Sequence, residues 1–161
     1  MKKIVLYSLV ISIFLCFACS KMDEYEDAQD KAFENLRKSL LTDSKYLKDS
    51  NNNLIDCYDD DGILLALQNV KKDTIHYADT DTVTIIYTGV SMRNNKTFST
   101  NDTIQFIYGN NSLIEGWKIA LPHIRKFSTG VLLISYDKAY GKHRAGLIEP
   151  YQPLKYTFST K

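Results

Sequence analysis

The feature that most constrains this fold is a series of short strand-like runs that begins at Ile63 and continues to Phe158. In the clearest of them, Asp81–Thr88, apolar residues alternate with threonine, which is the period of a strand with one buried face. Gly89 is expected to end this run, and Met92–Lys96 to form the following turn. The remaining strand-like runs are Ile63–Val70, Thr97–Phe98, Ile104–Tyr108, Val131–Tyr136 and Leu154–Phe158.

One segment between these runs has helical spacing. Leu113–Ile119 predicts one or two helical turns, with Ser112 as the N-cap and Pro122 just after the helix. One short helix among several mostly antiparallel strands is typical of the α+β class. We therefore predict a sheet of five to six strands wrapped over one short helix, preceded by an N-terminal helical and spacer segment.

Two aromatic motifs in this region predict a binding pocket. Leu113–Trp117 contains the only tryptophan of the chain, and Ala139–Gly141 places Tyr140 on a later loop bounded by glycine. Large aromatic rings supply apolar area, and a tyrosine hydroxyl adds a hydrogen-bonding group. This combination suits a compact apolar group beside a carbonyl, such as a prolyl residue in a peptide.

The N-terminal residues have the pattern of an export signal. Lys2 and Lys3 precede an apolar run that ends at Ala18, which predicts a signal peptide over residues 1–18. The pair Ala18–Cys19 is similar to a bacterial lipoprotein signal, in which Cys19 is acylated and anchors the protein to a membrane. The alternatives are an ordinary signal peptide that contains cysteines, or a single anchor helix. We predict a lipid-anchored protein of the cell envelope, at the outer membrane, facing the periplasm or the surface.

Residues 19–61 are predicted to form the lipidated N-terminus, an acidic spacer and one amphipathic helix. The helix is expected from about Glu26 to Leu41, because Phe33, Leu36 and Leu40 recur at helical spacing. Asp59–Gly62 is expected in a loop, and it lacks the alternating ligand positions of a calcium-binding loop. The predicted globular domain covers residues 62–161.

Composition excludes several classes of function. The net charge of +1 includes the lysines of the signal peptide, so the mature chain is near neutral or slightly acidic. It has no basic stripe that would indicate nucleic-acid binding. After processing, Cys57 is the only free thiol, which leaves no intramolecular disulfide and no thiolate metal site. His76 and His123 are too far apart in sequence to indicate a metal by spacing. We predict neither a metal nor a cofactor.

The motifs of residues 62–161 resemble, in the same order, those of the FKBP-type peptidyl-prolyl isomerases. The matching segments are Val83–Gly89, which ends in Tyr-Thr-Gly; Lys96–Phe98; Phe106–Gly109 with Leu113–Trp117; Val131–Gly141, which ends in Ala-Tyr-Gly; and Ile148–Pro150 with Leu154–Tyr156. Each motif alone is short, but five of them in one order are specific. The resemblance implies an FKBP-like fold and catalysis of prolyl isomerisation.

The resemblance also implies a site. Its catalytic residues are Tyr140, whose hydroxyl donates to the substrate carbonyl, together with Tyr87 and the residue at position Ser99. The amide of Ile114 is implied to bind the chain beside the proline. The implied substrates are proline-containing polypeptides, and no cofactor is needed. The implied substrate-binding residues are Phe98, Ile104, Phe106, Leu113, Ile114, Trp117, Ile148 and Tyr156.

The sequence departs from the family pattern in four places, of which the first three touch the chemistry and the fourth only the local backbone. Ser99 stands where the family has an aspartate, so the charge is lost at this position. The segment between Phe98 and Gly109 is shorter than usual, and Tyr156 replaces a phenylalanine. Phe127 lies near a common turn glycine, and Tyr136 replaces a proline. We predict a prolyl isomerase that assists exported proteins outside the cytoplasm, with activity weakened by Ser99. The alternatives are a non-catalytic FKBP-like lipoprotein that binds peptides or a protein partner, and a scaffold within a surface complex.

Overall fold

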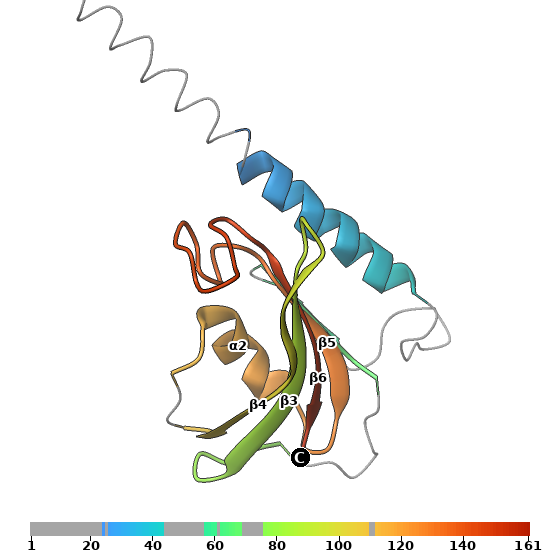
Figure 1. Ribbon diagram of the computed structural model, residues 1–161. Coiled ribbons are helices and arrows are strands. Elements are labelled where there is room, and N and C mark those ends of the chain that lie inside the picture. Colours follow the sequence, from blue (N-terminus) through green and yellow to red (C-terminus); the bar gives the residue numbers. More distant parts are fainter. Residues whose placement is uncertain (1–23, 25, 44–56, 61, 69–75, 110–111) are drawn as a thin grey trace, which may run out of the picture.

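The computed structural model describes residues 24, 26–43, 57–60, 62–68, 76–109 and 112–161 (Figure 1). The predicted signal peptide, Cys19 and most of the acidic spacer lie outside these residues. Residues 26–42 form an N-terminal helix. The elements that follow are β1 (Cys57–Asp60), β2 (Ile63–Leu67), β3 (Thr82–Ser91), β4 (Lys96–Ile107), α2 (Glu115–Ala120), a 3-10 turn (Leu121–His123), β5 (Thr129–Ile134) and β6 (Leu154–Thr160).

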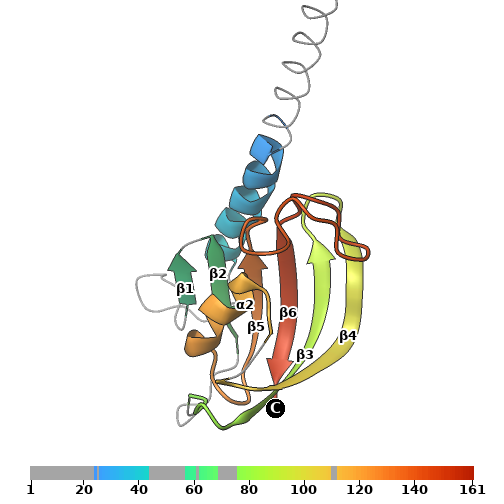
Figure 2. The same ribbon diagram turned by 90° about the vertical axis from the view of Figure 1, so that its left-hand side faces the viewer.

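The strands form one six-stranded antiparallel sheet in the order β1-β2-β5-β6-β3-β4. Helix α2 covers one face of this sheet, and the N-terminal helix crosses the other (Figures 1 and 2). This arrangement confirms the predicted α+β class and the sheet of five to six strands over a short helix. The amphipathic helix is confirmed as well, since residues 26–42 are helical.

The two helices explain why β2 is buried along its whole length. Side chains of a strand point alternately to the two faces of the sheet. Ile63, Leu65 and Leu67 join the core under α2, whereas Leu64 and Ala66 pack with the N-terminal helix. A strand covered on both faces has a continuous apolar sequence rather than an alternating one.

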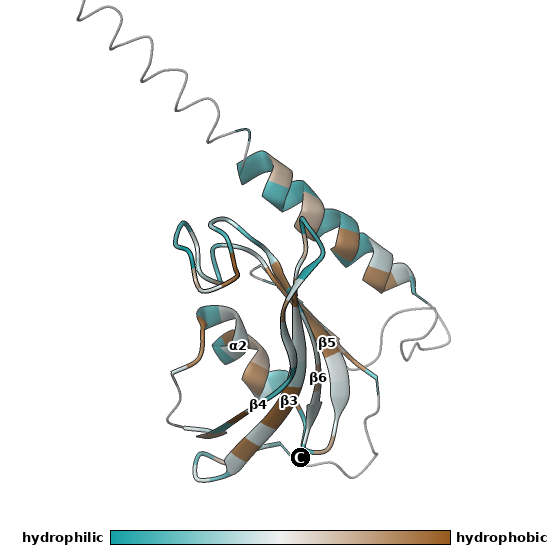
Figure 3. Ribbon diagram, viewed as in Figure 1, coloured by the Kyte–Doolittle hydropathy of each residue, from teal (hydrophilic) through white to brown (hydrophobic). Residues whose placement is uncertain are grey.

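The N-terminal helix is held to the sheet by an apolar stripe. Phe33 and Leu40 are buried in it, and Leu36 packs beside them. Hydrophobic and hydrophilic residues alternate around this helix (Figure 3), as its amphipathic pattern requires. At its edge, Arg37 donates to both carboxylate oxygens of Asp59, at 2.7 and 2.6 Å. The helix is therefore a packed layer of the domain.

The sheet begins earlier in the chain than the sequence predicted. Asp59 and Asp60 were expected in a loop, but they belong to β1, which begins at Cys57. The pairing of β1 with β2 places Asp60 opposite Ile63, so only a tight turn at Gly62 separates the strands. The φ of +73° at Gly62 is a conformation that glycine adopts without strain.

The predicted end of the Asp81–Thr88 run is also wrong. Strand β3 continues through Gly89 to Ser91. The ring of Phe98 lies over Gly89, where a Cβ would be only 2.3 Å from its Cε2 atom. Glycine is therefore needed at this position to admit the ring, and it does not end the strand. The turn that follows lies where the sequence predicted it, just before β4 begins at Lys96.

Strand β4 is continuous, and it contains a bulge at the place where the chain is short. Tyr87 pairs with Asp102 and Gly89 pairs with Ser99, so two residues of β4 oppose Thr88 alone. One of these two, Asn101, has a φ of +52°, and its N–H donates to Thr88 Oγ1 at 3.2 Å. Bulges of this kind redirect the side chains beside them.

Helix α2 begins at Glu115, and the predicted cap at Ser112 is wrong. The N-cap is Ile114, which makes no side-chain capping bond. The N–H of Gly116, which has no acceptor within the helix, instead donates to the carbonyl oxygen of Lys138, at 2.8 Å. A tertiary contact thus supplies the acceptor that a capping side chain usually provides.

Candidate functional site

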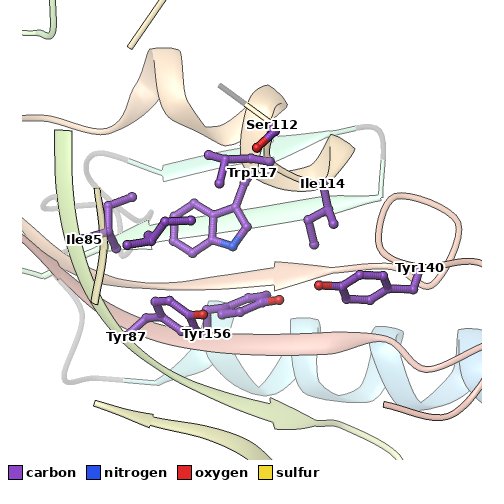
Figure 4. A pocket seen from close by; sticks show the side chains of 9 residues that line it. Ile85, Tyr87, Ser112, Ile114, Trp117, Tyr140 and Tyr156 are labelled. Atoms are coloured by element: carbon purple, nitrogen blue, oxygen red, sulfur yellow. The ribbon is translucent and has the colours of Figure 1, made fainter. Parts of the chain in front are cut away.

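A cavity lies between α2, the sheet and the loop that follows β5 (Figure 4). Its volume is about 160 Å³. Trp117 lies at its floor on α2, and Tyr140 lies on the loop at the other side (Figure 4). The lining residues are Ile85, Tyr87, Ile104, Ser112, Leu113, Ile114, Trp117, Tyr140 and Tyr156.

Most of the predicted site residues come together around this cavity. Tyr87, Ile104, Leu113, Ile114, Trp117, Tyr140 and Tyr156 line it. Four predicted residues, Phe98, Ser99, Phe106 and Ile148, do not line it. Phe98, Phe106 and Ile148 support the same core, and Ser99 is buried in β4. Ile85 and Ser112 also line the cavity, although neither was predicted as a site residue. Ile85 is two residues before Tyr87 in β3 and so shares its face of the strand, and this spacing was a signal for it.

Tyr156 is the centre of the aromatic wall. The rings of Trp117, Tyr87 and Phe98 all approach it edge-on, with centroids 5.2, 5.5 and 5.7 Å away. Edge-to-face pairs at this separation are favourable beyond the area that they bury. Trp117 also packs edge-on against Phe158, at 5.5 Å. Three rings of the wall therefore pack against one residue of β6, Tyr156.

Hydroxyl groups are directed into this aromatic cavity. Figure 4 shows the hydroxyl of Tyr140 pointing toward Tyr156. Burial raises the pKa of Tyr140 above its usual value, and Tyr87 adds to this rise. Burial likewise raises the pKa of Tyr156, and the nearby Tyr140 and Tyr87 raise it further. A hydrogen bond from Trp117 acts in the opposite direction. Both phenols are therefore neutral hydrogen-bond donors at neutral pH.

The loop that carries Tyr140 is fixed by backbone hydrogen bonds. The N–H of Gly141 donates to the Tyr136 oxygen at 2.8 Å, and the N–H of Tyr151 donates to the Gly141 oxygen at 2.7 Å. Gly141 has a φ of +58°, which favours glycine. Tyr140 is 37% exposed. It therefore stands at the rim of the cavity, where it can reach both solvent and a bound group.

The backbone of Ile114 offers a second donor at the cavity. Its carbonyl oxygen accepts from Trp117 and Lys118, at 3.1 and 3.3 Å. Within the described part of the chain, no group accepts from its N–H. The residue has an extended conformation, with φ −62° and ψ 156°. This donor is free to pair with the backbone of a bound peptide.

Ser99 is tied to a carboxylate that the sequence analysis did not identify. Its hydroxyl donates to Asp102 Oδ2 at 2.6 Å. Asp102 is paired with Tyr87 across the strands, so the two side chains project from the same face of the sheet. A negative charge is therefore held beside Tyr87 although Ser99 carries none. The bulge at Asn101 produces this pairing, and no sequence pattern signals it.

The described residues give no indication of a metal centre. Among them, no three His, Cys, Asp or Glu side chains lie close enough to hold an ion. His123 stacks on Tyr58, with ring centroids 3.9 Å apart, and the backbone of His76 forms an isolated β-bridge with that of Arg125.

In the same described part of the chain, no helix is long and apolar enough for a membrane crossing. The lining of the cavity offers apolar surface and neutral hydroxyl donors to a ligand.

Comparison with known proteins agrees with this architecture. Residues 74–159, more than half of the chain, match the family model of the FKBP-type peptidyl-prolyl cis-trans isomerases. The fold is similar to the crystal structure of FkpA from Escherichia coli, with a TM-score of 0.63 and 21% identity. That match covers 88% of this chain and 62% of the FkpA chain. No match was found among curated proteins. On the family match and the fold together, the chain belongs to the FKBP-type peptidyl-prolyl cis-trans isomerase family.

Proposed function

We propose that this protein catalyses cis-trans isomerisation of X-Pro bonds in exported proteins, outside the cytoplasm. The observation that carries the proposal is the neutral aromatic cavity with Trp117 at its floor and the Tyr140 hydroxyl at its rim. The cavity suits a prolyl ring, and the hydroxyl suits the carbonyl next to it. The reaction makes and breaks no bond, so a set of neutral groups is sufficient.

The physical basis of the rate enhancement is preferential binding of the twisted amide. Rotation about a peptide bond has a barrier of about 18–20 kcal/mol, because the C–N bond has partial double-bond character. Resonance also separates charge in the planar amide, which water stabilises. A cavity that excludes water removes this stabilisation, and Tyr140 and the Ile114 N–H hold the chain on either side of the bond. Each tenfold increase in rate needs about 1.4 kcal/mol of preference for the twisted state.

A protease-coupled assay on a short X-Pro peptide tests the activity. We expect acceleration by the native protein and about a tenfold lower kcat/KM for Tyr140→Phe, since one hydrogen bond to the carbonyl is lost. Tyr151→Phe is the matched control, because Tyr151 lies on the same loop but does not line the cavity. Uncatalysed rates for the native protein would exclude the enzymatic function.

Asp102 distinguishes this proposal from its alternative. A non-catalytic peptide-binding module is favoured by the loss of the family aspartate at Ser99. The hydrogen bond between Ser99 and Asp102 favours the enzyme, because it holds the Asp102 carboxylate next to the position of the family aspartate. We expect Asp102→Asn to lower kcat/KM about threefold, and Ser99→Asp added to Asp102→Asn to restore it, because one carboxylate is then present again. Peptide binding without acceleration in native protein and Ser99→Asp would instead support the binding module.

The proposed location rests on the N-terminal sequence. Cys19 follows the predicted signal peptide, and its acylation would anchor the domain to the cell envelope through a spacer and the N-terminal helix. Metabolic labelling with a fatty acid tests the anchor, with Cys19→Ala as the variant and Cys57→Ala as its control. Label that persists in Cys19→Ala would exclude lipidation at this residue.

A further inference from the structure

Three consecutive basic residues follow Tyr140 at the rim of the cavity. Lys142, His143 and Arg144 are all exposed. In the described part of the chain, neither Lys142 nor Arg144 has an ion-pair or side-chain hydrogen-bond partner. The paired cations show the contrast: Arg37 contacts Glu34 and Asp59, and Lys126 contacts Asp81 at 2.7 Å. The charges beside the cavity are thus available to a ligand.

The basic segment is held in place at both ends. On one side, the N–H of His143 donates to the Tyr140 oxygen at 3.1 Å. On the other, Ala145 and Ile148 exchange hydrogen bonds of 3.0 and 2.9 Å across a tight turn. Ile148 is buried, which anchors this turn to the core. The three side chains are therefore presented from a fixed backbone.

Their short sequence separation from Tyr140 limits how far the basic residues can lie from the cavity. One residue spans at most about 3.6 Å, so the Cα atoms of Lys142 and Arg144 lie within about 7 and 14 Å of the Tyr140 Cα. A peptide whose proline fills the cavity places its residues within four positions of the proline in the same range. Long, exposed basic side chains extend this range further.

Few acidic groups of the protein oppose these charges. The cavity lining contains no charged residue. The acidic side chains nearest in the chain to the cavity lining or to Ile148 are Asp102, Glu115 and Glu149, and Asp102 accepts a hydrogen bond from Ser99. None of the three forms an ion pair with Lys142 or Arg144. A ligand carboxylate therefore meets unbalanced positive charge on this side of the rim.

We propose that Lys142–Arg144 selects substrates that carry an acidic residue within about four positions of the proline. The inference rests on the proposed function, since it concerns the peptide that enters the same cavity. The attraction acts at the surface, where water and salt screen it. It therefore affects the choice among substrates more than the reaction itself.

Matched peptides test the selection. Three short peptides that differ only in Glu, Gln or Lys two residues from the proline are assayed at low salt. We expect kcat/KM to be about fivefold higher for the Glu peptide than for the Gln peptide, which corresponds to about 1 kcal/mol. The Lys peptide should be the poorest. The Glu-to-Gln ratio should fall toward one in 0.5 M salt, where the Debye length is only about 4 Å.

Charge reversal identifies the residues responsible. In the double variant Lys142→Glu and Arg144→Glu, we expect the preference to invert in favour of the Lys peptide. The double variant Lys31→Glu and Lys38→Glu is the control. It makes the same change in net charge at exposed positions of the N-terminal helix, on the other face of the sheet. The control should keep the preference for the Glu peptide.

Binding separates this inference from the proposed function. Trp117 is the only tryptophan and lines the cavity, so its fluorescence measures the Kd of each peptide without any turnover. Equal Kd and equal kcat/KM for the Glu and Gln peptides would overturn the acidic preference and leave the isomerase intact. Tighter binding of the Glu peptide without catalysis would support the preference and exclude the isomerase.

Discussion

The two faces of the sheet are covered in different ways. The face under the N-terminal helix is packed with aliphatic side chains, including Leu64, Val131 and Leu133, around the ring of Phe33. The face under α2 is aromatic, and its rings meet edge-on around Tyr156. Both helices bury apolar surface against the same strands, but only the α2 side encloses the cavity lined by Trp117.

The difference follows from the shapes of the side chains and the length of the helices. Under the N-terminal helix, aliphatic side chains of the strands meet a helix that spans residues 26–42. Under α2, large rings meet a helix that spans only Glu115–Ala120 and covers less of the sheet. Both faces therefore contribute buried core to the domain, and the α2 face also leaves a cavity where a ligand can bind.

The largest expected effect separates stability from activity. Leu133→Ala removes a side chain with 0% exposure from the face under the N-terminal helix. We expect a loss of about 3 kcal/mol in the free energy of unfolding, from lost burial and the cavity left behind. Urea denaturation measures it. The kcat/KM of the folded fraction should change less than twofold, and a larger change would show that this face also shapes the site.

Gly116→Ala tests the close packing of α2 on the sheet. Alanine usually stabilises a helix relative to glycine, by about 1 kcal/mol. Here, however, a Cβ would lie 2.4 Å from Ile134 Cγ2. We expect a net loss of about 1–2 kcal/mol in unfolding free energy, and about a tenfold loss in kcat/KM because Trp117 moves with the helix. Ile134→Val removes only the Cδ1 contact of 2.8 Å and keeps Cγ2, so the double variant should recover only a small part of both losses.

Alkaline pH should weaken the N-terminal-helix face through Cys57. Burial, with a contribution from Asp59, raises the pKa of this thiol from 9.0 to about 11. The unfolded chain thus loses its proton first, and stability present below pH 9 is lost as the pH rises toward 11. We expect a fall of about 1 kcal/mol over this window, measured by denaturation at several pH values. In Cys57→Ala the pH dependence should be shallower, and an unchanged slope would contradict the assignment.

The smallest effect concerns the polarity of the cavity. Tyr156→Phe removes one buried hydroxyl and keeps the edge-on ring contacts. Because the wall becomes more apolar, we expect a proline peptide to bind about threefold more tightly, a gain of about 0.7 kcal/mol. Trp117 fluorescence measures the Kd. Weaker binding would instead indicate that the Tyr156 hydroxyl donates to the substrate.

The sequence predicted much of the fold because local periodicity fixes which residues face the core. The strands and the short helix followed from such patterns, whereas the placing of Trp117 and Tyr140 in one pocket followed from their aromatic motifs and from the resemblance to the FKBP family. The packing of residues 26–42 on the sheet did not, since an amphipathic helix does not show what covers its apolar stripe. The cap of α2 was missed because Lys138, distant in sequence, supplies the acceptor.

The site was harder to predict at β4 than elsewhere. The residue count from Phe98 to Gly109 indicates a short segment, but not that the chain keeps its strand by inserting a bulge. That bulge pairs Asp102 with Tyr87 and puts Asp102 within hydrogen-bond distance of Ser99. A single positive φ at Asn101 accompanies this change, and such a conformation depends on tertiary contacts.

The order of the strands also bears on how the domain assembles. Strand β6 follows all other strands in the chain, yet it lies between β5 and β3. Until it pairs, β1-β2-β5 and β3-β4 are separate pieces with unpaired edges, which are prone to aggregation. Their union needs contacts between distant residues, such as Ile85 with Thr160, and contacts of this kind form slowly. Because Tyr156 lies on β6, the cavity forms only at this late step, and an unfinished chain has no site.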